Sequence, residues 1–326
     1  MAKRKTIPVE TFASSSAAVA LLKQSAWTFG PMDDQVYELR VQLATPGVFT
    51  PAKADIVIPG LPTLDGFLSF VAFQVALTEA LTINPDMVGA FLGQWSKALR
   101  DSTLWIDFPL PLRPAQLGTI EIFDCSIGLP VEGSDVLIPA GAFFARGLNF
   151  ETYPKVTDSI PLRRRVLEPY HRPLNLAHKL ETGSGPTKLL DNRMYFSLTQ
   201  EYQFYFRGDV SGVKRLLTFA REHRIGMGKK TTLGYGQIAE FELRCSTAKA
   251  TLVQRVPNRI EYSLIKTLPY ASVMAQRSHA DSLLFGSPTF KVVNPLETWG
   301  AYKPPYWIRK HQTQVLNYGT LLLPQS

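Results

Sequence analysis

Apolar and polar positions alternate along residues 36–49, and this period of two predicts a half-buried strand. The strand is expected to end at the turn Thr45-Pro46-Gly47. Residues 67–81 follow and are apolar on every side over a length that suits a helix, which indicates deep burial against a sheet. Asp65 or Thr63 is the expected N-cap of that helix.

Further along, hydrophobic periodicity predicts another long helix, several strands and a second helix on the sheet. The predicted elements are a helix at 85–99, strands at 119–131, around Gly141 in 136–150 and at 193–207, a helix at 212–224 and a strand at 237–243. This order predicts an α+β fold with a ferredoxin-like (RRM-like) core and insertions. We expect an N-terminal arm at 1–34, a main domain at 35–248 with a basic insertion at about 151–192, and a C-terminal extension at 249–326.

The composition is typical of a folded protein, and the positive charge is concentrated in one segment. The 326 residues are 45% hydrophobic and 19% charged, with a formal net charge of +8. Residues 160–230 hold 14 Lys and Arg against 6 Asp and Glu, so this segment carries the whole surplus. Charge gathered in one segment favours a polyanionic partner, although a solvated face or an acidic protein neighbour is the alternative explanation.

Other compositional features exclude several classes of protein. The two cysteines have no paired spacing and the five histidines are scattered, which argues against a disulfide framework, a metal site or a cofactor. A cytoplasmic location is therefore expected. Residues 66–83 are the most apolar stretch, but Gln74 and Glu79 interrupt them, so we expect no membrane span.

The segment 223–236 joins a predicted helix to a predicted strand and contains four glycines and two lysines. Glycine lets backbone approach a polyanion, and lysines, hydroxyls and backbone N–H groups can bind phosphate oxygens. Gly228-Lys229 is followed by Lys230 and has no glycine at the upstream position, so this is not a P-loop. A flexible connection without ligand is the alternative. The expected RNA-binding residues of this glycine-rich loop are His223, Arg224, Gly226, Met227, Gly228, Lys229, Lys230, Thr231, Thr232, Gly234 and Tyr235.

The basic insertion is the second expected RNA-binding element. It is rich in proline and contains three consecutive arginines, which provide both charge and flat surfaces for stacking. The expected RNA-binding residues here are Arg163, Arg164, Arg165, Tyr170, His171 and Arg172. We expect this lobe and the glycine-rich loop to enclose a single strand of RNA, with rings stacking on bases and cations neutralising phosphates.

Three features together resemble the RAMP superfamily of CRISPR effector subunits. They are the strand ending in Thr45-Pro46 before Leu64-Asp65-Gly66-Phe67-Leu68, the aromatic strand that ends in Phe-Tyr-Phe-Arg-Gly-Asp at 204–209, and the glycine-rich loop after the next helix. Together they cover about residues 36–245. Within the superfamily the chain is most similar to the single-copy subunit that caps the 5′ handle of the guide RNA, in its type IV version.

This resemblance implies a non-catalytic, RNA-binding subunit of a ribonucleoprotein complex for antiviral defence. The implied partners are the crRNA, the backbone subunits and the large subunit, with target double-stranded DNA as a further candidate. One alternative is a metal-independent endoribonuclease that matures crRNA, with His171, His178 or His223 as acid or base. Another is a backbone subunit that forms a filament along the guide.

Overall fold

The computed structural model describes residues 9–49, 60–89, 91, 107–131, 140–146, 190–197, 199–229, 231, 234–274, 290–304 and 311–324. The chain divides into two compact units. The larger unit comprises Met1–Leu137 and Ser197–Ser326, and the smaller unit comprises Ile138–Phe196. The architecture is α+β with antiparallel sheets, as the sequence predicts.

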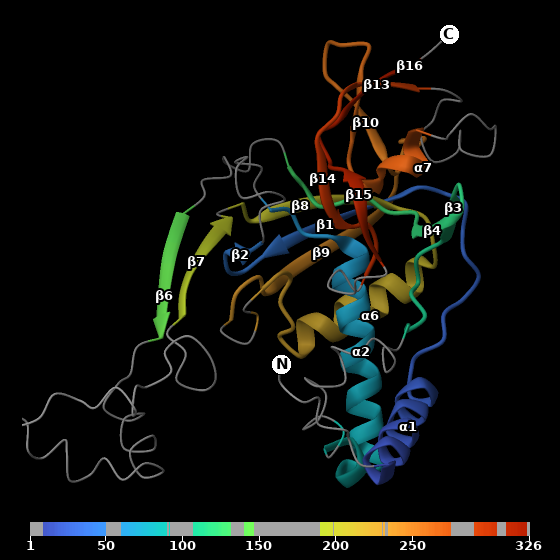
Figure 1. Cartoon of the computed structure of the whole chain (residues 1–326), viewed down its shortest axis with the longest axis vertical. Coiled ribbons are helices and arrows are strands. Elements are labelled where there is room, and N and C mark those ends of the chain that lie inside the picture. The colour runs from blue at the N-terminus through green and yellow to red at the C-terminus, as the bar shows by residue number, and fades with distance from the viewer. Residues whose placement is uncertain are drawn as a thin grey trace, which may run out of the picture. The chain divides into compact units, whose positions relative to one another are not determined.

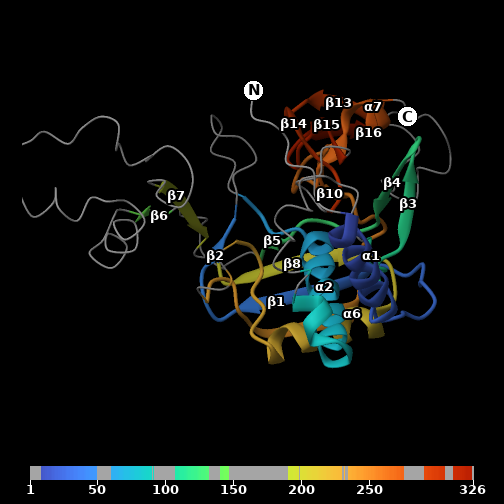
Figure 2. The ribbon, with the colours of Figure 1, turned by 60° about the horizontal axis from the view of Figure 1, so that its bottom comes forward.

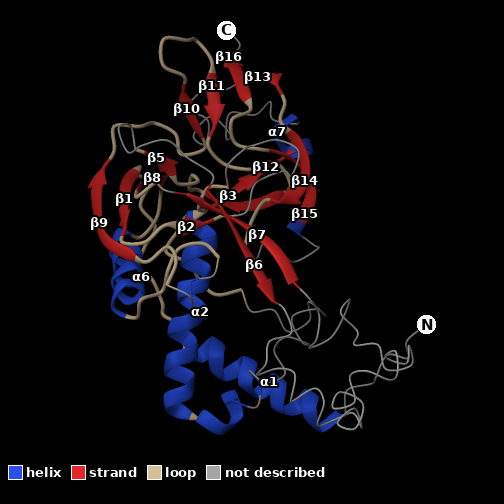
Figure 3. Cartoon of the chain, turned by 90° about the vertical axis from the view of Figure 1, so that its left-hand side faces the viewer, coloured by secondary structure: helices blue, strands red, loops and turns tan. Residues whose placement is uncertain are grey.

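The main sheet of the larger unit has four antiparallel strands in the order β5-β8-β1-β9 (Figures 1 and 3). These strands are β1 (Tyr37–Leu43), β5 (Leu129–Pro130), β8 (Glu201–Phe206) and β9 (Ile238–Cys245). Side chains alternate between the two faces of a strand, so one face of β1 and β8 is apolar and buried. Tyr202, Phe204 and Phe206 are fully buried on that face.

Three helices lie on this apolar side of the sheet: α1 (Val9–Gln24), α2 (Leu64–Ile83) and α6 (Val210–Glu222) (Figure 2). α2 packs against both α1 and α6. The predicted N-terminal arm is therefore part of the main core, because Ala18 and Leu22 of α1 are completely buried in it. Thr63 occupies the N-cap of α2 but makes no capping bond through its side chain, whereas Asp65 accepts a hydrogen bond from the Gly66 N–H.

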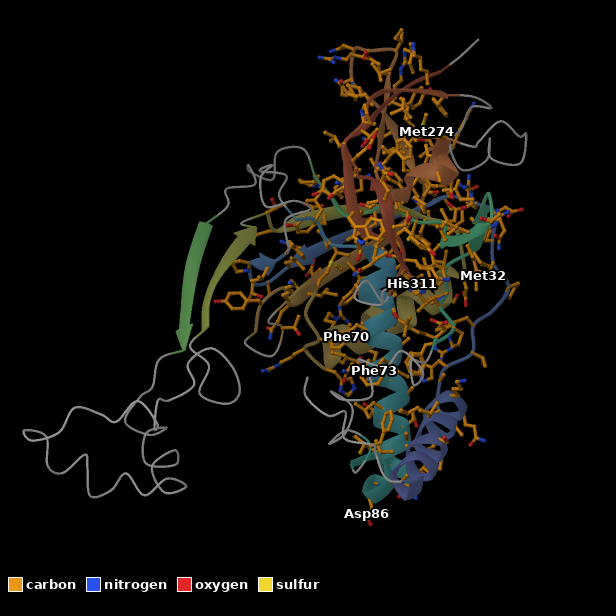
Figure 4. The ribbon with its side chains drawn as sticks, viewed as in Figure 1. Met32, Phe70, Phe73, Asp86, Met274 and His311 are labelled. Carbon is orange, nitrogen blue, oxygen red and sulfur yellow. The ribbon has the colours of Figure 1, made fainter. Side chains whose placement is uncertain are left out.

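α2 is long and apolar enough to cross a membrane by length and composition alone. Nine of its side chains are nevertheless buried in the protein, and they include the charged Asp65. Its outer side carries Phe70, which is 40% exposed, and the half-buried Phe73, which packs against Phe108 (Figure 4). These contacts place one side of α2 in the main core of the larger unit.

The C-terminal part of the larger unit forms a second, strand-rich layer (Figures 2 and 3). One sheet has the order β10-β11-β16-β13 and another the order β12-β15-β14. The elements are β10 (Val253–Arg255), β11 (Tyr262–Leu264), β12 (Leu268–Pro269), α7 (Tyr270–Met274), β13 (Phe290–Asn294), β14 (Glu297–Ala301), β15 (Gln312–Leu316) and β16 (Leu321–Pro324).

This layer has its own apolar core, which also takes in an earlier hairpin of the chain. Leu117 and Ile122, from β3 (Pro114–Leu117) and β4 (Ile120–Phe123), are buried there beside Leu252 and Leu316. The predicted strand 119–131 is in fact two elements, β4 and β5, because residues 124–128 leave the hairpin before they join the main sheet. The C-terminal extension thus packs with residues that precede it by more than a hundred positions.

Two buried ion pairs connect the main core to the C-terminal part. Arg207 donates to Asp124 at 3.0 Å and also to the carbonyl oxygens of Asp34 and Lys249. Lys266 donates to Asp65 at 2.7 Å. Both pairs are almost completely shielded from solvent, so the loss of one partner leaves an uncompensated buried charge.

The smaller unit contains a single described hairpin. β6 (Ala140–Arg146) pairs antiparallel with β7 (Leu190–Ser197). The predicted single strand 193–207 is therefore two strands, β7 and β8, which belong to different sheets. The prolines and arginines expected at 151–192 lie largely outside the described residues.

Candidate nucleic-acid interface

The glycine-rich loop starts at the C-terminus of α6 with a left-handed residue. Arg224 has φ +53°, and the N–H of Ile225 donates to the carbonyl of Ala220 at 2.7 Å. This is the Schellman arrangement, in which glycine is the usual residue at the left-handed position. The preceding His223 stacks on Phe219, with 4.0 Å between the ring centroids. Both His223 and Arg224 remain exposed at the end of the helix.

Beyond this cap the loop backbone is fixed to the short segment that follows β1. The N–H of Lys229 donates to Val48 at 2.8 Å, and the N–H of Gly236 donates to Pro46 at 3.0 Å. The N–H of Met227 donates to Gly236 within the loop. Val48 belongs to β2 (Gly47–Val48) and bridges Gly228 in parallel. These three N–H groups therefore bind protein carbonyls, contrary to the expectation that the loop's amides face phosphates.

Close packing accounts for the glycines. A Cβ on Gly226 would lie 2.2 Å from the carbonyl oxygen of Tyr235, and a Cβ on Gly236 would lie 2.0 Å from that of Met227. Gly236 also has φ +67°. Gly228 would meet the Val48 carbonyl at 2.6 Å. The glycines let three backbone segments meet, so their role at this loop is structural.

Thr45 holds the two ends of the loop together. Its hydroxyl donates to the carbonyl of Gly234 at 2.7 Å and accepts from the N–H of Gln237 at 3.0 Å. From the sequence, Thr45-Pro46 was predicted as the end of a strand and as part of the resemblance to RAMP proteins, but not as the source of these two hydrogen bonds. The feature of the sequence that points to these bonds is a threonine at the end of a strand, because its hydroxyl commonly bonds to nearby backbone groups.

The loop residues predicted to bind RNA divide into an exposed group and a buried group. His223, Arg224, Gly228 and Lys229 are exposed, and Thr231, Gly234 and Tyr235 are half-buried. Gly226 and Met227 are buried, with Met227 packed into the main core, so neither is available to RNA. Lys230 and Thr232 lie outside the described residues. The basic lobe, with Arg163, Arg164, Arg165, Tyr170, His171 and Arg172, also lies outside them.

The outer face of α6 adds cations that sequence analysis did not select. Lys214 and Arg215 line a shallow hollow of about 530 Å³ beside Trp27. The guanidinium of Arg215 lies 4.4 Å from the centre of the Trp27 ring, and Phe219 meets the same ring edge-on. This places an aromatic ring and two cations on the helix that leads into the loop. Trp27 escaped notice because only the fold brings the N-terminal segment to α6.

The polar face of the main sheet has the opposite charge. The cross-strand register puts nine side chains on it: Glu38, Arg40, Gln42, Glu201, Gln203, Tyr205, Glu240, Glu242 and Arg244. Four are glutamates and two are arginines. Burial alone raises the pKa of Glu38, but hydrogen bonds from Arg244 and Arg40 outweigh it and hold that pKa below its usual value. A negative face with one aromatic ring does not suit the base-stacking surface of an RRM.

The described residues also bear on metal binding and catalysis. No group of three or more His, Cys, Asp or Glu that could hold a metal ion occurs among these residues. Of the histidines proposed for cleavage, only His223 lies within them, and it stacks on Phe219 as described above. No protein-family model matches this chain, and no curated protein matches it.

Proposed function

We propose that this chain is a RAMP-type, RNA-binding subunit of a CRISPR ribonucleoprotein complex, and that it caps the 5′ handle of the crRNA. The order β5-β8-β1-β9, with α2 and α6 on one face, supports a ferredoxin-like core. The glycine-rich loop joins α6 to β9, the position at which the resemblance to RAMP proteins expects it.

The observation that carries this proposal is the geometry of the loop. Its inner side is fixed by hydrogen bonds to residues 45–48, while His223, Arg224 and Lys229 extend into solvent. A fixed backbone that presents cations without an acidic partner is suited to phosphate oxygens, because the cations are already held near one surface. No salt bridge is formed by His223, Arg224 or Lys229 with any described residue.

In this account the side chains, not the backbone amides, contact the RNA. Lys229 and Arg224 neutralise phosphates, and the half-buried ring of Tyr235 offers a surface for one base. The glycines act indirectly by letting the loop pack. The basic insertion supplies further cations on the RNA, and the crRNA, the backbone subunits and the large subunit are the partners. The free thiols of Cys125 and Cys245 support a cytoplasmic setting.

A salt titration of RNA binding tests the proposal. The double variant Lys229→Ala/Lys230→Ala removes two cations, so affinity for a single-stranded repeat RNA falls and the slope of log affinity against log salt becomes shallower by about 1–2. The matched control is Lys249→Ala/Lys291→Ala, which removes two exposed lysines outside the loop. The control keeps the wild-type slope.

If the salt slope of the loop variant is unchanged, the loop does not contact RNA. If both double variants lose the same affinity, the loop lysines act only through the overall charge of the protein. The copy number in the assembled complex, measured by native mass spectrometry, separates a cap from a filament subunit. One copy supports capping, whereas several copies support the filament.

A further inference from the structure

A small cavity lies where the start of α2 meets the second layer of the larger unit. Its volume is about 210 Å³, and its walls come from the start of α2, the segment before β5, the segment between β11 and β12, and the strands β14 and β15 with the residues after them. Asp65, Lys266, Trp299 and Asn317 are among the lining residues. This volume is below that of pockets for drug-sized ligands and suits one small ring system.

The floor of the cavity is a buried ion pair with one unused donor. Lys266 gives one ammonium N–H to Asp65 at 2.7 Å and another to the Cys125 sulfur at 3.2 Å. No further acceptor for the third N–H occurs among the described residues. Asp65 already neutralises the charge of Lys266, so this donor suits a neutral carbonyl oxygen better than an anion.

Two further side chains at the cavity, Asn317 and Trp299, could contact a bound ring. Asn317 is 4% exposed and lines the cavity, and its side-chain amide has no hydrogen-bond partner among the described residues. An amide offers one acceptor and two donors in a plane. Trp299 also lines the cavity, yet 71% of it is exposed, an unusual position for the largest aromatic residue. An exposed indole beside a cavity that contains buried polar groups is suited to stack on a flat ring.

A ring carbonyl, a planar hydrogen-bonding edge and a stacking surface are together the properties of a nucleobase. We propose that this cavity binds one unstacked base with a ring N–H next to a ring carbonyl, guanine or uracil, from single-stranded RNA. Lys266 donates to the carbonyl, Asn317 pairs with the adjacent edge, and Trp299 stacks on the ring. This inference rests on the proposed RNA-binding function, but it concerns a site other than the glycine-rich loop.

Binding of free nucleosides tests the cavity without the phosphate contacts of the loop. Guanosine, uridine, adenosine and cytidine are each titrated into the full chain up to millimolar concentration and followed by saturation-transfer NMR. Guanosine or uridine binds more tightly than adenosine and cytidine. Trp299→Ala weakens that binding by about 5- to 150-fold, the range that corresponds to stacking on one base.

Two further variants keep this test independent of folding defects. Asn317→Ala also weakens guanosine or uridine binding and lowers the preference over adenosine. Phe70→Ala removes another exposed aromatic residue, on α2 and away from the cavity lining, and leaves nucleoside binding unchanged. Lys266→Met is less informative, since it leaves Asp65 as an unpaired buried charge.

Three results would overturn the inference: no saturation transfer from any nucleoside, equal binding of all four, or wild-type binding by Trp299→Ala. The loop variant Lys229→Ala/Lys230→Ala separates the two proposals. If that variant loses no RNA affinity while guanosine still binds through Trp299, the proposed function fails at the loop and the cavity stands. If the loop slope changes while Trp299→Ala has no effect, only the cavity fails.

Discussion

Alanine substitutions at three glycines of the loop separate backbone strain from steric contact. Gly234 has φ +87° but open space around it, because the nearest atom to an added Cβ is Gln237 Nε2 at 3.8 Å. Gly226 has no left-handed φ, yet its Cβ would lie 2.2 Å from a backbone oxygen. Gly236 combines both conditions, with φ +67° and a contact of 2.0 Å. The three variants therefore differ only in which penalty they incur.

The magnitudes follow from these geometries. A left-handed alanine costs about 1–2 kcal/mol, and the lower entropy of the unfolded chain offsets about 0.4–1 kcal/mol of that. Gly234→Ala should therefore destabilise by about 0–1.6 kcal/mol. A methyl group forced against fixed backbone costs about 1–3 kcal/mol, which we expect for Gly226→Ala. Gly236→Ala incurs both penalties and weakens its hydrogen bond to Met227, for about 2–5 kcal/mol in total.

Urea unfolding followed by circular dichroism measures these differences as shifts in the midpoint at constant slope. The expected order of destabilisation is Gly236→Ala, then Gly226→Ala, then Gly234→Ala. RNA affinity, measured well below the unfolding midpoint, should fall in the same order because the loop no longer holds Lys229 in place. If Gly226→Ala and Gly236→Ala are no less stable than Gly234→Ala, the close backbone packing of the loop is wrong.

Two further predictions concern the buried ion pairs. Arg207→Met leaves the buried Asp124 carboxylate without its cation and should lower the free energy of unfolding by about 3–5 kcal/mol. Arg113→Ala breaks a pair with the largely exposed Asp34 and should lower it by less than about 1 kcal/mol. Equal losses of stability in urea unfolding would refute this distinction. Burial raises the pKa of the Cys125 thiol to about 12. Burial alone lowers the pKa of Lys266, but the charge of Asp65 outweighs it and raises that pKa above its usual value. Both groups keep their protons in the folded state while the unfolded chain loses them. Stability therefore falls by up to about 1.4 kcal/mol per pH unit above about pH 9 for Cys125, and above about pH 10.5 for Lys266. Cys125→Ala should make the decline between pH 9 and 10.5 shallower, and identical pH profiles would contradict this assignment.

Local patterns were sufficient for the elements of the main core. The alternation in β1 and β8 and the apolar length of α2 are strong periodic signals, and each predicted element occurs close to its expected position. Boundaries were less accurate where the chain changes sheet. Residues 193–207 read as one aromatic strand, but the break near Thr199 divides them between β7 and β8, and local periodicity carries no information about which sheet a strand joins.

The glycine-rich loop was predicted at its position between a helix and a strand, but its packing was not. Glycine and lysine content marked the loop, and Lys229 is exposed there as expected. Composition could not show that Gly226 and Gly236 face protein carbonyls, since that depends on contacts among three segments. Trp27 beside Arg215 and Trp299 beside Lys266 were missed for the same reason, because each pair joins residues that are distant in sequence.

Charge is distributed in a way that restricts where RNA can bind. Exposed cations occur on α6 and at the glycine-rich loop, whereas the polar face of the main sheet carries four glutamates against two arginines. A polyanion is repelled by the second surface and attracted by the first. The account therefore predicts RNA contacts at the edge of the fold and none across the sheet.

Ultraviolet cross-linking of bound single-stranded repeat RNA, followed by peptide mapping, tests this claim most directly. The account predicts cross-links within residues 223–235, with Tyr235 as the aromatic acceptor, and their loss in Lys229→Ala/Lys230→Ala. Cross-links at Tyr205 on the polar face of the sheet, with none in the loop, would contradict it.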